Sequence, residues 1–207
     1  MRRIHLYLYT PKLVDAADFA PKLALALAAT KVACVLVRAG EGGDIKKIVK
    51  ELAPVIQGAG AALMVDNDAQ LVARVGADGV QISGAGDALR GAVETLRPKS
   101  IVGACNLKTK DECMTAGELD IDFLMFGEPS KDGFVQNISK TVERVNWWAE
   151  IFNVPCIGYA PREEDIAPLT AAGADFVALG DWLWTHEDVA AKLKAIAQTI
   201  RDSTPVE

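Results

Sequence analysis

The sequence predicts a (β/α)8 barrel made of one domain that spans residues 1–207. The apolar period switches repeatedly between short continuous runs and patterns that repeat every 3.6 residues. The short runs are rich in Val, Ile, Leu and Ala and nearly free of charge, which is typical of parallel strands covered on both faces. Eight such pairs in about 200 residues fit a barrel at the small end of its size range. An open doubly wound sheet usually has about five to seven strands, so the count favours the barrel.

The eight strands are expected where the apolar runs are continuous. They fall at residues 4–9, 32–37, 61–65, 79–82, 100–104, 121–126, 155–158 and 176–179. The first run alternates, begins after Met1-Arg2-Arg3 and ends at Thr10-Pro11 with no small-residue cleavage site, so it predicts a strand and not a signal peptide.

The eight helices are expected between these runs, where apolar residues recur at helical spacing. They fall at residues 16–29, 44–58, 68–75, 87–96, 109–116, 138–152, 163–172 and 187–201. Two turns share the pattern Gly-Ala-Asp, at 76–78 and 173–175. The glycine is expected to end a helix in a left-handed cap, and the aspartate to lead into a buried strand. Both turns lie at the end of the barrel that serves stability.

Composition excludes several classes of protein. The chain has 22 basic and 28 acidic residues, a net charge of −6, and no basic stripe, which argues against a nucleic-acid partner. No apolar run is long enough to cross a membrane. The four cysteines are far apart and show no CxxC spacing, so we expect free thiols in a reducing cytoplasm. The sequence leaves monomer and homo-oligomer both open.

Functional residues are expected where the strands end, because barrel enzymes carry their sites at the carboxyl ends of their strands. The sequence places polar or glycine-containing segments at all eight of these ends. They are 10–11, 38–40, 66–68, 83–87, 105–106, 127–131, 159–162 and 180–182.

Three segments, 65–80, 101–127 and 155–182, resemble the family of thiamin phosphate synthase and its relative, the thiazole tautomerase. The best match is DNDAQLVARVGADGV at 66–80, which in the family is an Asn-Asp pair, a helix and Gly-Ala-Asp-Gly-Val. With the matching strand order, the resemblance covers nearly the whole chain. It is specific for the fold and superfamily and less specific for the activity.

The resemblance implies a reaction of thiamin biosynthesis on phosphorylated small molecules. The synthase joins a hydroxymethylpyrimidine pyrophosphate to a thiazole phosphate: pyrophosphate leaves first, and the thiazole nitrogen captures the pyrimidine carbocation. The resemblance assigns Mg²⁺ to this chemistry. It also assigns residues to three roles in this sequence: catalytic Arg38 and Lys131; substrate-binding Asn67, Asn106, Gly127, Gly158 and Gly180; and metal-binding Asp66, Asp68 and Asp87.

Several family positions hold other residues here. The family's Gln-x-Arg-x-Lys reads Leu36-Val37-Arg38-Ala39-Gly40, so only the arginine is retained. The family's Gly-Gly pair after strand seven is Gly158-Tyr159, and Asp181 follows Gly180 where a phosphate would sit. Arg162 could compensate for the negative charge of Asp181 at that phosphate site. The alternative is therefore a paralogue that binds a phosphorylated molecule without transferase chemistry. The tautomerase is the weakest alternative, because the loop after strand five has no His.

Each candidate also has a purely structural explanation. Arg38 could pair with Glu41 or Asp44. Asp66, Asp68 and Asp87 are all suitable helix N-caps. Lys131 could belong to an exposed turn. Cys105 is expected to be a buried filler, and the paired tryptophans at 147–148 to pack a helix on the barrel.

Overall fold

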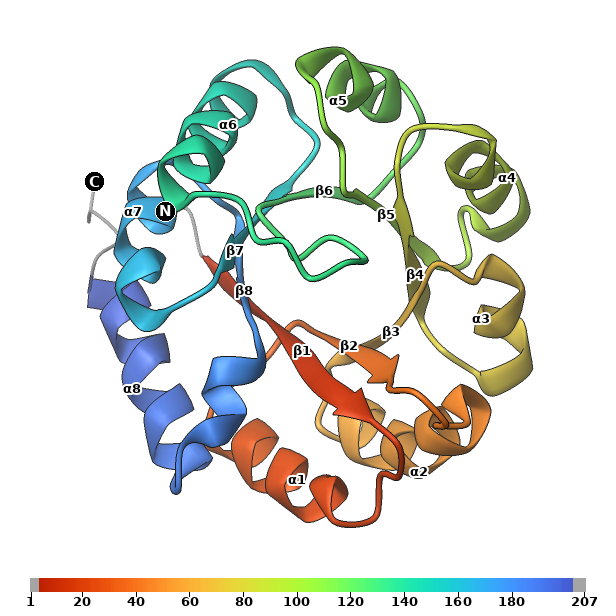
Figure 1. Cartoon of the computed structure of the whole chain (residues 1–207), viewed down its shortest axis with the longest axis vertical. Helices are drawn as coiled ribbons and strands as arrows, with labels where there is room; N and C mark the ends of the chain where they lie inside the picture. Colours follow the sequence, from red (N-terminus) through yellow and green to blue (C-terminus); the bar gives the residue numbers. More distant parts are fainter. Residues whose placement is uncertain (1–3, 203–207) are drawn as a thin grey trace.

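The computed structural model describes residues 4–202 and contains a closed barrel of eight parallel strands in chain order. The strands form the inner ring and the helices an outer ring (Figure 1). The (β/α)8 prediction is confirmed. The strands are β1 (His5–Leu13), β2 (Cys34–Ala39), β3 (Ala62–Asp66), β4 (Gly79–Ser83), β5 (Ile101–Cys105), β6 (Phe123–Phe126), β7 (Cys156–Ala160) and β8 (Phe176–Leu179).

The helices lie within a few residues of the ranges expected from periodicity. They are α1 (Phe19–Ala29), α2 (Ile45–Gly58), α3 (Ala69–Val75), α4 (Asp87–Leu96), α5 (Lys110–Gly117), α6 (Ile138–Ile151), α7 (Ile166–Ala171) and α8 (Val189–Asp202). Two short 3₁₀ helices, η1 (Glu163–Asp165) and η2 (Asp181–Thr185), precede α7 and α8. Within residues 4–202 no helix is long and apolar enough to cross a membrane.

Alternation along each strand divides the core into two parts. On β1, Tyr7 and Tyr9 point into the barrel, where they meet Leu36, Met64 and other inward side chains. The outward side chains pack against the helices in a larger apolar layer. Trp148 of α6 is fully buried and stacks on Phe152 at 4.0 Å between ring centroids, which confirms the packing role expected for that tryptophan pair.

The helix-to-strand turns have the expected geometry. Gly76 and Gly173 have φ angles of 69° and 93°, the left-handed conformation that glycine adopts at low cost. Asp78 accepts a hydrogen bond from the Leu63 amide at 2.7 Å, and Asp175 accepts one from Cys156 at 2.9 Å. Asp78 thus links the start of β4 to the start of β3, and Asp175 links the start of β8 to the start of β7.

β1 is longer than the sequence predicts. It runs to Leu13, although Thr10-Pro11 was expected to end it at Tyr9. The register with β2 shifts between Tyr9 and Lys12. A proline is tolerated there because a bulge leaves one residue outside the regular ladder.

Candidate active site

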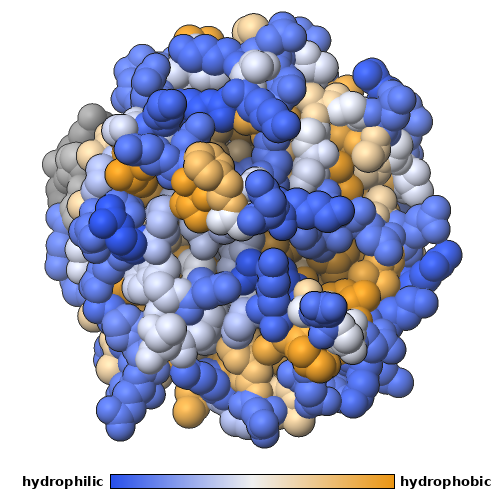
Figure 2. Space-filling view, viewed as in Figure 1, coloured by the Kyte–Doolittle hydropathy of each residue, from blue (hydrophilic) through white to orange (hydrophobic). Residues whose placement is uncertain are grey.

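The carboxyl ends of the strands bring the predicted charged residues to one mouth of the barrel. Arg38 is near the end of β2, Asp66 ends β3, and Asp87 begins α4. Asn106 directly follows β5, and Lys131 lies in a turn after β6. The segment between β6 and α6 crosses the centre of the ring in Figure 1. Hydrophilic side chains dominate this face, with apolar side chains in scattered patches (Figure 2).

Arg38 is held by groups from the neighbouring strand β1 and from the segment that follows β8. Its Nε donates to the Thr10 carbonyl at 2.8 Å, and its Nη2 contacts the same carbonyl and the Asp181 carboxylate. Its guanidinium also lies over the Tyr9 ring, 4.9 Å from the centroid. The expected pairing with Glu41 or Asp44 is wrong, because barrel closure brings Asp181, from the segment after β8, next to β2.

A continuous series of hydrogen bonds, here called the polar chain, links the ends of β3 to β6. Asn67 Nδ2 donates to Asp66 at 2.8 Å, and Asn67 Oδ1 accepts from the Ser83 amide at 2.8 Å. Asn106 Nδ2 donates to Ser83 Oγ at 3.3 Å, and the Asn106 amide donates to Glu128. Both asparagines have a φ of 54°, so their backbones take a conformation that Asn tolerates better than most residues.

Glu128 is the residue that the sequence did not identify. It is only 8% exposed, and its Oε2 has no hydrogen-bond partner among residues 4–202. Burial raises the pKa of Glu128 to about 7, against the opposing effects of the hydrogen bond from Asn106 and the charge of Arg144. Its position after Gly127 was visible in the sequence, but nothing local indicated that the carboxyl would be buried.

The aspartates differ in what they can bind. Asp68 accepts a hydrogen bond from the Leu71 amide at 3.0 Å and is the N-cap of α3, which is the structural role that the sequence suggested for it. Asp87 is in the first turn of α4, but Gly86 takes the cap position without a side-chain bond. Withdrawal from water raises the pKa of Asp66, while the Asn67 bond and the charges of Arg38 and Lys12 oppose that rise.

This donor set can be tested against a metal ion. Among residues 4–202 there is no group of three His, Cys, Asp or Glu side chains that could hold a metal. Mg²⁺ usually takes only one or two carboxylates together with substrate oxygens. Asp66 fits that role: it is at the mouth, its carboxyl is partly desolvated, and its Oδ1 accepts a hydrogen bond from Asn67 that helps to orient the carboxylate.

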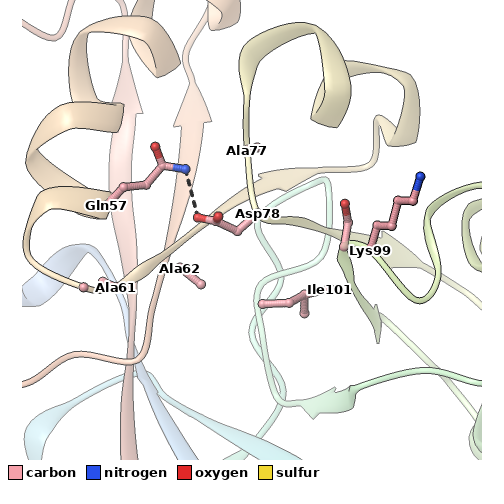
Figure 3. A pocket seen from close by; sticks show the side chains of 9 residues that line it. Gln57, Ala61, Ala62, Ala77, Asp78, Lys99 and Ile101 are labelled. Carbon is pink, nitrogen blue, oxygen red and sulfur yellow. Dashed lines mark hydrogen bonds between the residues drawn. The ribbon is translucent and has the colours of Figure 1, made fainter.

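The larger of two cavities described lies at the opposite end of the barrel. It measures about 520 Å³ and is lined by residues from the starts of β3, β4 and β5 (Figure 3). Gln57 Nε2 donates to Asp78 there at 3.1 Å, and Asp78 is already bonded to the Leu63 amide. These polar groups of the cavity therefore stabilise the helix-to-strand turn that contains Asp78. A second cavity of about 350 Å³ opens at the mouth beside Asn106, Lys108 and the 84–86 loop.

Comparison with known proteins identifies the family. The model of the thiamine monophosphate synthase family matches residues 6–182. The chain belongs to this family. It is 34% identical to a thiamine-phosphate synthase of Rhodospirillum centenum, over 90% of this chain and 92% of that protein. It is 31% identical to one of Hyphomonas neptunium, over 90% and 88%.

The fold is similar to that of solved barrels. A thiamine phosphate pyrophosphorylase from Pyrococcus furiosus superposes with a TM-score of 0.80 at 19% identity, over 99% of this chain and 98% of that one. A 3-hexulose-6-phosphate synthase from Salmonella typhimurium gives a TM-score of 0.76 at 14% identity, over 97% and 100%.

The glycines that the synthase family resemblance assigns to substrate binding also have packing reasons. A Cβ on Gly127, whose φ is +87°, would lie 2.5 Å from the Thr141 side chain of α6. A Cβ on Gly158 would lie 2.8 Å from Leu169 of α7. A Cβ on Gly180 would lie 1.9 Å from the hydroxyl of Tyr159. The bulky Tyr159 is therefore accommodated by the missing side chain at 180.

Two basic residues near the mouth have different surroundings. Arg162 pairs with Glu164 at 3.1 Å and with Asp165 at 3.2 Å, so its charge is committed locally and does not compensate for Asp181. Lys131 is exposed in a turn closed by the Ser130 amide and the Phe134 carbonyl at 2.9 Å. No ion pair involves Lys131 within the described part of the chain.

Proposed function

We propose that this protein acts as a thiamine-phosphate synthase, joining a hydroxymethylpyrimidine pyrophosphate to a thiazole phosphate with release of pyrophosphate. The carbon–oxygen bond to pyrophosphate breaks, and a carbon–nitrogen bond to the thiazole forms. The observation that carries the proposal is the gathering of Arg38 and Asp66 at one mouth beside the polar chain, in a chain 34% identical to a protein of that name.

In this proposal each residue acts on charge or orientation. The Arg38 guanidinium offers a fork that matches two phosphate oxygens and stabilises the departing polyanion. Asn106 orients polar atoms of the substrate from the polar chain, and Lys131 approaches from the segment over the mouth. Asp66 would hold Mg²⁺, which when bound would neutralise negative charge on the pyrophosphate.

A second candidate is a paralogue that binds a phosphorylated molecule without transferase chemistry. The ion pair between Arg38 and Asp181 favours this paralogue, because a bound anion would have to compete with the Asp181 carboxylate for the Arg38 guanidinium. A tautomerase has less support, since Asn106-Leu107 after β5 contains no His and Leu107 is buried. Cytoplasmic location is part of the proposal, because the four cysteines are buried free thiols.

The test combines turnover with anion binding. Purified protein is incubated with Mg²⁺ and both thiamine precursors, and product is measured for the wild type, Arg38→Ala and Asp181→Asn. Arg38→Ala should weaken pyrophosphate binding by about 1.5–3 kcal/mol, the usual worth of a hydrogen bond to a charged group. Asp181→Asn removes the carboxylate that pairs with the Arg38 guanidinium, so this variant should bind pyrophosphate more tightly than the wild type. Pyrophosphate binding without turnover in the wild type would favour the paralogue.

A further inference from the structure

We propose that Lys12 is a second anion-binding residue of the mouth and supplies the positive charge that the second strand lacks at Gly40. The inference rests on the proposed function, because it concerns the same pyrophosphate. Its basis is the bulge in β1, the small residue at 40 and the charges around Lys12.

The bulge decides which way Lys12 points. Tyr9 pairs with Leu36, so a regular ladder would set Pro11 opposite Arg38. The register shift instead sets Lys12 opposite Arg38. A one-residue shift moves a strand's side chains to its other face, and paired residues in neighbouring strands share a face. Lys12 is thereby turned to the same side as Arg38.

The faces of the flanking residues agree with this orientation. Leu36, two residues before Arg38, belongs to the inner cluster of the barrel. Leu13, next to Lys12, packs in the outer layer against the helices. Since neighbouring side chains of a strand point to opposite faces, Lys12 points to the inner side, at the mouth.

The bulge is fixed in place by the arginine itself. The Arg38 amide donates to Thr10 Oγ1 at 3.0 Å, and Arg38 Nε donates to the Thr10 carbonyl at 2.8 Å. Thr10 is fully buried. The contact that orients Arg38 therefore also holds the extra residue that turns Lys12.

The backbone at Gly40 leaves room for this arrangement. A Cβ at position 40 would lie 3.0 Å from the Lys12 carbonyl oxygen and 3.5 Å from the Lys12 Cβ. The Gly40 amide donates to the Leu13 carbonyl at 2.7 Å. A side chain at 40 would thus crowd the extended β1, and the lysine expected there by resemblance is replaced by one from the adjacent strand.

The charges around Lys12 are those of an anion site. Lys12 is exposed and forms no ion pair with a carboxylate among residues 4–202. Arg38 is engaged by Asp181. Lys12 therefore brings a charge that is not committed to a carboxylate to the same side of the mouth.

The experiment titrates pyrophosphate by calorimetry at low ionic strength, with and without Mg²⁺, into four proteins. These are the wild type, Lys12→Ala, Lys12→Arg and the control Lys31→Ala, which removes the same charge from an exposed lysine before β2, at the opposite end of the barrel. Lys12→Ala should weaken binding about tenfold, and Lys12→Arg should restore most of it. Lys31→Ala should leave the affinity unchanged, and all melting temperatures should agree.

The outcomes separate this inference from the proposed function. Equal affinities in Lys12→Ala and Lys31→Ala would overturn the inference, even if the wild type turns over both precursors. Lys12-dependent binding without turnover would support the inference and refute the synthase. A wild type that binds no pyrophosphate would overturn both.

Discussion

The two halves of the barrel mouth satisfy their polar groups in different ways. On the side of β8, β1 and β2, opposite charges meet directly, as Arg38 and Asp181 do, and the Trp184 Nε1 donates to the Tyr9 carbonyl at 2.6 Å. On the side of β3 to β6, the polar chain connects amide and hydroxyl groups and ends in the carboxyl of Asp66 at one side and of Glu128 at the other.

The difference shows which half of the mouth contains groups that destabilise the folded state. The first half has close packing and a neutralised charge, so a ligand must compete with internal partners there. The second half keeps a buried carboxyl, that of Glu128, with one oxygen that has no hydrogen-bond partner among residues 4–202, and two asparagines with left-handed backbones. Such costs persist where the surroundings fix them, and they cluster at functional sites. The second half is therefore the preformed side of the mouth.

The largest expected effect concerns the buried carboxyl of the second half. A raised pKa means that folded Glu128 holds its proton more tightly than the unfolded chain does, so the free energy of unfolding should fall as the pH rises from about 4.5 to about 7. The full contribution is on the order of 3 kcal/mol. Glu128→Gln keeps the acceptor for Asn106 and removes this pH dependence.

Urea unfolding of wild type and Glu128→Gln at pH 5 and pH 7.5 measures this effect. The variant should gain stability relative to the wild type at the higher pH. Glu41→Gln, at an exposed position, serves as the control and should follow the wild type. If the free energy of unfolding of all three proteins changed equally with pH, burial of Glu128 would not destabilise the protein at neutral pH.

The next effect tests the close packing of the first half. Gly180→Ala should destabilise the protein by about 1–3 kcal/mol, because the new Cβ would collide with Tyr159. Adding Tyr159→Phe should recover part of the loss, since it removes the nearest atom but leaves the ring carbon Cζ at 2.7 Å. Thermal melts measure both, with Gly91→Ala as the control, since a Cβ there meets no atom within 4 Å. An unaffected melting temperature in Gly180→Ala would mean that the first half is loosely packed.

The smallest effect separates two aspartates of the second half. Asp68→Ala should cost about 1 kcal/mol of stability, the usual worth of an N-cap, and leave Mg²⁺-dependent pyrophosphate binding unchanged. Asp66→Asn should weaken that binding with little change in stability. Denaturant unfolding and calorimetry on both variants check the pair. Loss of Mg²⁺-dependent binding in Asp68→Ala would assign the metal to the helix cap.

Local features of the sequence determined the barrel and the position of its functional end. Alternation of apolar runs and helical patterns follows from short-range geometry, so eight strands could be read directly. The left-handed glycines at 76 and 173 and the cap at Asp68 depend only on a few adjacent residues, and each is present. Because strand ends of a barrel converge, Arg38, Asp66 and Asn106 could be assigned to one mouth without knowing their contacts.

Tertiary structure alone decided which groups meet at that mouth. Arg38 and Asp181 are 143 residues apart in sequence and become neighbours only when β8 closes on β1. Glu128 is buried by elements that its own segment does not predict. The face taken by Lys12 depends on one residue of register between β1 and β2, which is set by the hydrogen bonds of Thr10 with Arg38. These features depend on contacts between segments that are far apart in sequence, and the local sequence pattern of one segment does not determine which other segment it contacts.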